Sequence, residues 1–477
     1  MPELSATPIL NSPPDLALRK AIRAKREELG YILAIIDDDP TGNQTVYDLP
    51  LLANWSVESL QKVLSQDPPG FFVLANTRSL AEREAIQRVK EIAHNLQQAN
   101  QQARKKLLLI SRSDSTLRGH FPAEVEALHE LIDQEEVRYL LAPAMYEGKR
   151  LTWQGTQYLQ KGQELIPVSE TPYAQDPSFG YRHAYLPDWV AEKSNGGWPA
   201  EKVKLLPASQ SSKKGDLLDS LEALRPGETG VVNAAHYADL DASAFAIWQW
   251  LAHRGTSSVV IRSSSSILPS LLGQVPQDLL SAHDLKGSNA AGGLVVVGSF
   301  VPTSTRQLAV LRAGLPEHMA IELDPERLLE LSSEAYSQEL SSQVNASLAG
   351  GHLTVLYTSR RLVKTEDKEG HLSLGQQISA TLVEVIQSLA QAPSFLVAKG
   401  GITSHVLATE GLGMQTGQVR GQVLPGVPLW EMGPEARFPG MSYVVFPGNV
   451  GEEDSLLRLC QNLERREAGG EKRDLDT

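Results

Sequence analysis

Short apolar runs alternate with helical patterns over the first third of this chain, and this alternation restricts the fold more than any other feature. Strands are expected over residues 32–36, 71–75, 106–110 and 137–142, with helices over 80–104 and 122–133. Alternation of this kind is typical of a doubly wound, mainly parallel α/β sheet. Ligands bind such sheets at the carboxyl ends of the strands, so the loops that follow the strands are the places to look for a site.

The same pattern divides the chain into parts. A chain of 477 residues is too long for one ordinary core, which predicts two large domains. Further strands are expected over 203–206, 230–233 and 258–261, with helices over 214–224 and 239–253, and a second α/β unit begins at Leu294. We expect an N-terminal extension over 1–29, a first domain over 30–270, a second over 285–465 and a charged tail over 466–477.

Two stretches interrupt the alternation. Residues 152–198 are rich in aromatic and proline residues and are expected to form a flap or an insertion that shapes the site. The serine run 263–266 and the polar stretch 284–293 have the composition of a link between domains.

Composition narrows the class of protein. The 44 basic and 57 acidic residues leave a net charge of −13, which argues against a nucleic-acid-binding or membrane-binding protein but permits a local phosphate pocket. The single cysteine, Cys460, excludes an intramolecular disulfide framework and is expected to be a packing residue. The sequence has no signal-peptide pattern and no run of about 18 apolar residues, so we expect a cytoplasmic protein.

Three successive carboxylates, Asp37, Asp38 and Asp39, follow the first expected strand and precede a turn at Pro40-Thr41-Gly42. Crowded carboxylates raise one another's pKa unless a cation compensates, so a buried site here requires Mg²⁺, Lys or Arg. For three aspartates alone, an acidic surface turn would be the plainer interpretation. The apolar run before them and the turn after them favour a site.

Basic and hydroxyl side chains follow the other strands of the first sheet. The candidate binding residues in these loops are Arg78, Asp114, Ser115, Thr116, Arg118, Gly119, Lys149 and Arg150. Guanidinium groups suit bidentate binding of a carboxylate or phosphate, and hydroxyls suit a polyhydroxylated ligand. A lone arginine more often forms a surface ion pair, but several such loops on one sheet edge favour a binding site.

The second α/β unit carries glycine-bearing loops after its strands. Strand 294–297 leads into a turn with Ser299 and a helix over about 304–312, where free backbone N–H groups and the helix dipole suit an anion. Strand 394–398 leads into a loop whose glycines let the backbone approach a polyphosphate closely. The candidate nucleotide-binding residues are Ser299, Lys399, Gly400, Gly401, Ile402, Thr403, Ser404 and Gly448. The spacings of a P-loop and of a dinucleotide-binding loop are both absent.

Several motifs in order resemble the four-carbon acid sugar kinase family over about residues 31–462. They are Asp38-Asp39-x-Thr-Gly42, Asp114-Ser-Thr-Leu-Arg-Gly119, Pro143-Ala144 with a following Gly-Lys-Arg, Lys399-Gly-Gly-Ile-Thr-Ser404, and the late LPGVPLW and FPGNVG segments. The resemblance implies a two-domain kinase. Its N-terminal domain would bind a sugar acid such as threonate or erythronate, and its C-terminal domain would bind ATP.

Carried over by position, the family's acidic loop falls on Asp38 and Asp39, its substrate loop on residues 114–119, and its nucleotide-binding positions on or beside Ser299, on 400–404 and on Gly448. This chain departs from the usual family pattern at Asp37, Pro40, Asn43 and in its AMYEGKR segment, all in the substrate domain. The resemblance implies a sugar acid and ATP as partners, with Mg²⁺ bridging the phosphates. Asp38 or Asp39 is the candidate general base.

Two other interpretations remain open from the sequence. Asp37-x-Asp39-x-Thr41 also matches the first motif of haloacid-dehalogenase-like phosphatases, with Asp37 as nucleophile and Asp39 as acid/base, although that reading gives the Lys399 loop no purpose. A non-catalytic sugar-acid-binding protein is the third. His120 is expected to be a satisfied polar residue rather than a catalytic one. The specific acid and the oligomeric state stay open, and a homodimer is compatible with the sequence.

Overall fold

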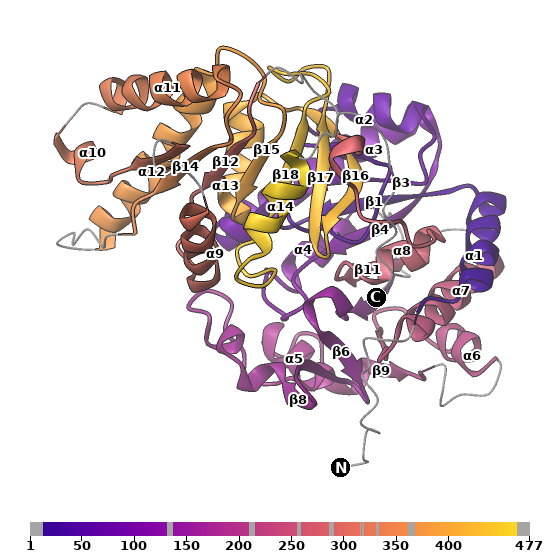
Figure 1. The fold of residues 1–477 in the computed structure, drawn as a ribbon. Coiled ribbons are helices and arrows are strands. Elements are labelled where there is room, and N and C mark those ends of the chain that lie inside the picture. The colour runs from indigo at the N-terminus through magenta and orange to yellow at the C-terminus, as the bar shows by residue number, and fades with distance from the viewer. Residues whose placement is uncertain are drawn as a thin grey trace, which may run out of the picture. The chain divides into compact units, whose positions relative to one another are not determined.

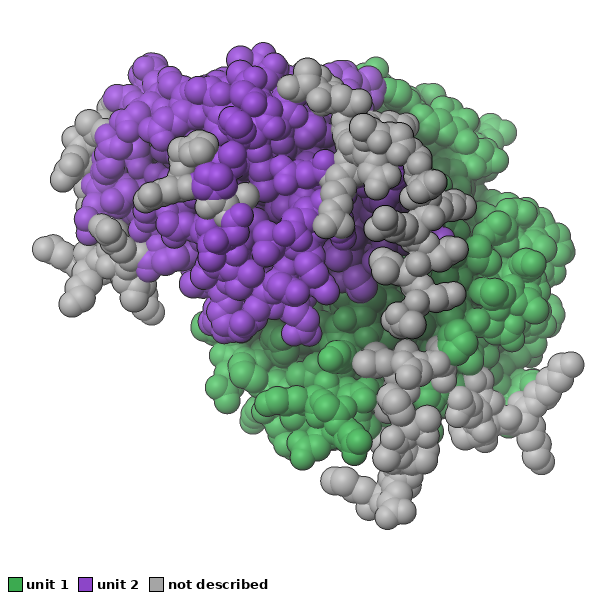
Figure 2. Space-filling model, in the orientation of Figure 1, with its two compact units in different colours: residues 1–277, 415–420 green, residues 278–414, 421–477 purple. Residues whose placement is uncertain are grey.

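The computed structural model describes residues 13–130, 137–208, 215–254, 259–285, 291–314, 316, 319–330, 333–360 and 368–464. The chain divides into two compact units, coloured separately in Figure 2. Unit 1 comprises residues 1–277 and 415–420, and unit 2 comprises residues 278–414 and 421–477. The charged tail expected over 466–477 and the first 12 residues lie outside the described part of the chain.

Unit 1 is built on a parallel sheet with the strand order β2-β3-β1-β4-β11-β5-β10-β9. The strands are β1 (Tyr31–Asp37), β2 (Leu49–Leu52), β3 (Gly70–Leu74), β4 (Lys106–Arg112), β5 (Arg138–Ala142), β9 (Val203–Leu206), β10 (Thr229–Val232) and β11 (Val259–Ser263). The first residues of β16 (Thr416–Leu424) pair with β2 in antiparallel fashion. The predicted doubly wound α/β architecture is confirmed, and every residue of β1 is buried as its apolar run indicates.

Helices cover both faces of this sheet (Figure 1). They are α1 (Leu16–Leu29), α2 (Val57–Ser65), α3 (Glu82–Ala103), α4 (Ala123–His129), α5 (Leu186–Lys193), α6 (Asp216–Glu222), α7 (Tyr237–Arg254) and α8 (Ile267–Leu272). Because side chains alternate along a strand, Ile32 and Ile36 pack into the core formed with α2, α3 and α4, whereas Tyr31 packs on Trp248 of α7. The end of the helix expected over 122–133 lies outside the described residues.

The insertion over residues 152–198 breaks the alternation because it forms antiparallel hairpins. Strands β6 (Arg150–Trp153), β7 (Thr156–Lys161) and β8 (Glu164–Pro167) make a separate sheet, followed by α5. Trp189 of α5 stacks on Phe121 with ring centroids 4.6 Å apart, and the Tyr181 hydroxyl donates to the carbonyl of Thr116 at 2.7 Å. The insertion is therefore anchored in the core and supports the loop that follows β4.

The serine run 263–266 is not the link that its composition predicts. Ser263 ends β11, which lies between β4 and β5, and all four serines are completely buried inside unit 1. Ser265 donates its hydroxyl to the carbonyl of Gly42 at 3.0 Å. A polar run resembles a linker in composition, but small hydroxyl side chains also fit where strand ends crowd together and can satisfy their hydrogen bonds locally.

Unit 2 has a parallel sheet with the order β13-β14-β12-β15-β18, to which β17 adds in antiparallel orientation. Its strands are β12 (Leu294–Val297), β13 (Ala320–Leu323), β14 (Thr354–Thr358), β15 (Leu396–Lys399), β17 (Val427–Met432) and β18 (Ser442–Phe446). Its helices are α9 (Pro302–Ala313), α10 (Arg327–Glu330), α11 (Ser333–Ala349), α12 (Lys368–Gln387), α13 (Gly401–Val406) and α14 (Ser455–Glu464). The predicted second α/β unit is thus present.

Cys460 lies in α14 within the hydrophobic core of unit 2, and burial raises the pKa of its thiol. It is the packing residue that the sequence predicts. Throughout the described ranges, we find no helix with both the length and the apolar character that a membrane crossing requires.

Candidate active site

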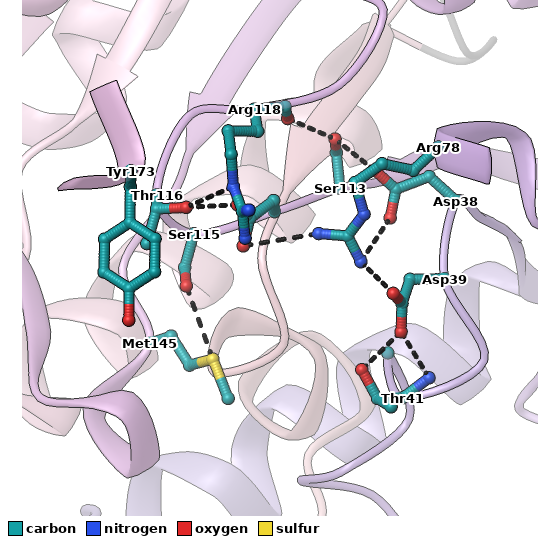
Figure 3. A network of polar contacts seen from close by, with 12 residues as sticks. Asp38, Asp39, Thr41, Arg78, Ser113, Ser115, Thr116, Arg118, Met145 and Tyr173 are labelled. Carbon is teal, nitrogen blue, oxygen red and sulfur yellow. Dashed lines mark hydrogen bonds and ion pairs between the residues drawn. The ribbon is translucent and has the colours of Figure 1, made fainter. Parts of the chain in front are cut away.

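Arg78 brings together carboxylates from two loops of unit 1 (Figure 3). It lies in a single helical turn, Thr77–Ser79, that follows β3. Its guanidinium forms an ion pair with Asp39, lies 3.5 Å from Oδ1 of Asp114 and lies 3.7 Å from Oδ1 of Asp38. Burial lowers the pKa of Arg78, but the surrounding aspartates raise it overall. The cation that the aspartate cluster requires is therefore supplied by the protein itself.

Asp39 and Asp38 differ in how exposed their side chains are to solvent. The Asp39 side chain is 22% exposed and that of Asp38 is 3% exposed. Asp39 Oδ1 accepts hydrogen bonds from the backbone N–H of Thr41 at 2.8 Å and from the Thr41 hydroxyl. Burial raises the pKa of Asp39, but Arg78 and Thr41 together hold it below its usual value, so the carboxylate is ionised at neutral pH.

Asp38 and Gly119 fix the shape of the loop that follows β4. Asp38 Oδ2 accepts a hydrogen bond from the Ser113 hydroxyl at 2.8 Å. Gly119 has a φ of +112°, and a Cβ atom there would lie 2.8 Å from Ser113 Oγ and 3.2 Å from Asp38 Oδ2. Only glycine therefore fits both the backbone conformation and the space at this position.

Asp37 is completely buried beneath the turn at Gly42. Arg112 Nη1 lies 3.1 Å from Asp37 Oδ1, and a Cβ atom at Gly42 would lie 2.0 Å from Asp37 Oδ2. Burial raises the pKa of Asp37 to about 7, although Arg112 opposes the rise. A phosphatase nucleophile must be open to its substrate, so this geometry contradicts the haloacid-dehalogenase interpretation of Asp37.

Arg118 and Arg150 both pack on the ring of Tyr173, with guanidinium carbons 5.2 and 5.4 Å from its centroid. Arg118 Nε donates to Asp114 Oδ2 at 2.7 Å, and Arg150 Nη1 donates to Ser115 Oγ at 3.0 Å. The Thr116 hydroxyl donates to the same carboxylate of Asp114. Arg118 Nη1 also lies 3.3 Å from Asp176 Oδ2, so its guanidinium is paired with two carboxylates, whereas Arg150 is paired with hydroxyl groups and the Met145 sulfur.

A cavity of about 610 Å³ opens beside Arg78 and Gly119. Its other walls include His120, Phe179 and Lys193. His120 Nε2 lies 3.2 Å from the carbonyl of Thr77 and 3.1 Å from that of Leu80, so it is the satisfied polar residue that the sequence indicates. Lys149, in contrast, is exposed and joins none of the hydrogen bonds or ion pairs found for this cluster in the described residues.

The sequence reasoning missed several buried partners of this cluster. Arg262 Nη2 lies 3.1 Å from both Ser113 Oγ and the carbonyl of Arg118. Arg112 also donates to Ser265, at 3.0 Å. Glu124 accepts a hydrogen bond from the Thr77 hydroxyl, and burial raises its pKa to about 7. Arg262 could have been predicted as a site residue from the sequence. It lies at the carboxyl end of β11, one residue past the expected end of that strand.

Three loops meet at the carboxyl ends of adjacent strands in unit 2. Because β15 lies between β12 and β18, the turns that carry Ser299, Gly400 and Gly448 are neighbours. Gly400 has a φ of +115°, and a Cβ atom there would lie 2.8 Å from Ser299 Cβ. Ser304 Oγ lies 3.1 Å from both Ser299 Oγ and the carbonyl of Gly448. The glycines therefore let three loops pack closely around the start of α9.

Among the other predicted nucleotide-binding residues, Ile402 is exposed, whereas Thr403 and Ser404 are buried. Ile402 is 65% exposed, and Gly401 begins α13 beside it. Ser404 is buried and donates to the carbonyl of Gly400 at 2.7 Å, so it holds the loop together. Thr403 packs against Gly298, where a Cβ atom would lie 2.4 Å from its Oγ1.

From its place beside the glycine loop, Lys399 is expected to bind the nucleotide. In the structure its side chain points into the protein instead. Its side chain is completely buried, its ammonium donates to the carbonyl of Pro447 at 2.6 Å, and it lies 3.8 Å from the centroid of Phe446. Burial lowers the pKa of Lys399 to about 6. The residue therefore ties two loops together from inside the sheet.

A protein-made metal centre is not found in the part of the chain that the structure describes. No group of three or more His, Cys, Asp or Glu side chains there is arranged to hold a metal ion. The aspartates around Arg78 are neutralised by guanidinium groups instead. These residues do not fit a resident metal ion held by the protein alone.

Family models match both halves of the chain. Residues 33–271 match a sugar-binding N-terminal domain, and residues 294–456 match a nucleotide-binding C-terminal domain. The D-threonate kinase of Bordetella bronchiseptica is 27% identical over 454 residues, which cover 92% of this chain and 98% of that protein.

Two solved structures have a similar fold. One is from Salmonella typhimurium LT2 and is described as a putative tRNA synthase; it has a TM-score of 0.65 and 17% identity, covering 90% of this chain and 98% of that one. The other is Haemophilus influenzae protein HI1011, with a TM-score of 0.61 and 16% identity, covering 90% of this chain and all of that one. At these identities the likeness concerns the fold alone.

Proposed function

Since this chain belongs to the four-carbon acid sugar kinase family, we propose that it transfers the terminal phosphoryl group of ATP to a hydroxyl of a four-carbon sugar acid. The observation that carries this proposal is that unit 1 contains both a candidate anion-binding site, called here the seat, and an accessible carboxylate. Arg118 and Arg150 form the seat on Tyr173, and Asp39 is the accessible carboxylate. The named activity of the Bordetella relative makes threonate the first acid to test.

The seat fits the carboxylate end of a sugar acid. A guanidinium binds a carboxylate through two parallel hydrogen bonds, and both guanidinium groups pack against the Tyr173 ring. Ser115 and Thr116 lie in the same loop and place hydroxyl groups near the seat. A sugar alcohol of the same length lacks the carboxylate and would bind far more weakly.

Asp39 is our candidate for the group that accepts the proton of the attacking hydroxyl. It is ionised at neutral pH, and its side chain is more exposed than that of Asp38. Its lowered pKa makes it a weak base, which suits phosphoryl transfer because this reaction depends chiefly on alignment and charge neutralisation. Asp38 positions the Ser113 hydroxyl, and its negative charge adds to the electrostatic potential around Arg78.

The loops of unit 2 that carry Ser299, Gly400 and Gly448 are the proposed seat for the ATP phosphates. Free N–H groups at the start of α9 and the close packing permitted by the glycines support this assignment. Mg²⁺ would arrive with the nucleotide, coordinated mainly by phosphate oxygens and water, and would neutralise charge on the phosphate chain.

An acid-dependent ADP assay tests this function. The protein is incubated with Mg·ATP and each stereoisomer of threonate and erythronate, with threitol and erythritol as controls that lack the carboxylate. We expect ADP release with at least one acid and with neither alcohol. Acid-independent phosphate release would contradict a kinase, and tight acid binding without ADP would instead support a non-catalytic binding protein.

A further inference from the structure

Arg360 occupies a place beside the Ser299 loop that neither the sequence motifs nor the proposed catalytic residues include. It follows β14, which pairs with β12 so that Tyr357 lies opposite Val297. The residues after the two strands are therefore neighbours at the carboxyl edge of the sheet. Arg360 Nη1 donates a hydrogen bond to the carbonyl of Ser299 at 2.6 Å.

The remaining edge of this guanidinium has no hydrogen-bond partner in the described part of the chain. Among the described residues, neither Nε nor Nη2 of Arg360 makes a hydrogen bond, and both atoms are closed to water. Among the residues that the structure describes, no carboxylate offsets the burial that lowers the pKa of Arg360, and only Tyr357 opposes that effect. Buried donors without acceptors are costly, and each one in a native protein calls for an explanation, such as a catalytic role or a bound water or ion.

The geometry of the unpaired edge limits what the ligand can be. Nε and Nη2 point to the same side of a guanidinium and form the fork that binds two oxygens of one carboxylate or phosphate. The bond from Nη1 to Ser299 holds the other side, so the fork is fixed in orientation. Phe300, whose ring centroid lies 5.3 Å from the guanidinium carbon, is 54% exposed and lies beside the fork.

We propose that Arg360 binds two oxygens of the nucleotide phosphate chain through Nε and Nη2, with its third nitrogen anchored to the Ser299 carbonyl. This inference rests on the proposed function, because it takes the Ser299 loop to be the seat of ATP. Arg360 adds a fixed positive charge to that seat, which Lys399 does not supply because its ammonium is turned toward backbone carbonyls.

Binding of Mg·ATP to the full-length protein, measured by calorimetry without the acid, tests this assignment. Arg360→Gln should weaken Mg·ATP binding by about tenfold to hundredfold, since charge-assisted hydrogen bonds are lost. Arg360→Lys should recover only part of the loss, because an ammonium keeps the charge but not the fork. Binding of adenosine, which has no phosphate, should not change in either variant.

Arg312→Gln is the matched control. Arg312 lies in the last turn of α9, at the end away from the loop, and its guanidinium packs on Tyr357. Its removal should leave Mg·ATP binding unchanged. Wild-type affinity for Mg·ATP in Arg360→Gln, or an equal loss of ATP and adenosine binding that indicates a collapsed loop, would overturn the inference. Failure of the wild-type protein itself to bind Mg·ATP would instead overturn the proposed function.

Discussion

Arg78 Nη1 lies 3.5 Å from Asp114 Oδ1, although the two residues follow different strands of the sheet in unit 1. The same guanidinium also forms an ion pair with Asp39, which follows β1. Arg78 thus joins the carboxylate proposed to receive a proton to the loop proposed to hold the acid. Removing it should affect both the stability of unit 1 and its chemistry.

Arg78→Met is expected to lower the free energy of unfolding by about 3 kcal/mol, because removal of one partner leaves buried charges uncompensated. Denaturant unfolding measures this change. Lys90→Met is the control: Lys90 lies 2.7 Å from Glu130 in an exposed pair, whose loss should cost at most about 1 kcal/mol. Equal losses in the two variants would show that Arg78 does not stabilise the cluster.

Asp39→Asn is expected to reduce kcat by about 10²-fold to 10⁴-fold, because it removes the proton acceptor and the ion pair with Arg78, while the affinity for ATP, whose proposed site is in unit 2, stays unchanged. Asp38→Asn should also lower turnover, through disturbed positions of Ser113 and Arg78. Steady-state kinetics and ATP binding together measure both effects. Asp67→Asn serves as the control, since Asp67 pairs only with Lys105 in an exposed ion pair among the described contacts. Full turnover in both site variants would reject the assigned roles.

Gly119→Ala is expected to reduce turnover strongly, because the added Cβ would press on Ser113 Oγ and Asp38 Oδ2. Gly162→Ala is a matched control with a φ of +62° but no atom within 4 Å of the added Cβ. Gly162→Ala should lose about 1 kcal/mol of stability from backbone strain alone, Gly119→Ala should lose more because of the added contacts, and only Gly119→Ala should lose activity as well. Comparable kinetics in the two variants would argue against a close fit between this loop and Asp38.

The pKa of Asp37 predicts a particular dependence of stability on pH. Burial raises that pKa to about 7 in the folded protein, above the value of about 4 in an unfolded chain. Folding therefore takes up a proton between these two values, and the contribution of Asp37 to stability falls as pH rises through this window. Above about pH 7 both states are ionised and the contribution becomes constant.

Asp37→Asn removes this titration while other groups titrate as before. The unfolding free energy of the wild type minus that of the variant, measured from pH 5 to 8, should decrease up to about pH 7 and then level off. A difference that stays constant over the whole range would mean that Arg112 holds the folded pKa at or below its usual value, contrary to the effect of burial.

Much of the sheet edge in unit 1 could be predicted from the sequence. The rule that ligands bind at the carboxyl ends of parallel strands led to Arg78, Asp114 and Arg118, and the structure brings these three together. The rule works because strands such as β1, β3 and β4 are continuous apolar runs, so their ends can be recognised. Arg262 was missed because β11 continues two residues past the expected strand end at Ile261.

Other features depend on tertiary contacts that no local pattern contains. Lys399 ends an apolar strand and precedes two glycines, which is equally typical of a phosphate-facing lysine and of a buried one. Its contact with Phe446 and Pro447, about 48 residues along the chain, decides between them. The burial of Ser263 to Ser266 likewise depends on where β11 inserts in the sheet, and the role inferred for Arg360 depends on the pairing of β14 with β12.

Phosphorus NMR of a reaction with Mg·ATP and threonate tests the central claim most directly. The account predicts a new phosphate monoester resonance that grows in equal amount with ADP, and that is absent when the acid is omitted. Growth of inorganic phosphate in place of the monoester, or the absence of any nucleotide consumption with every four-carbon sugar acid, would contradict it.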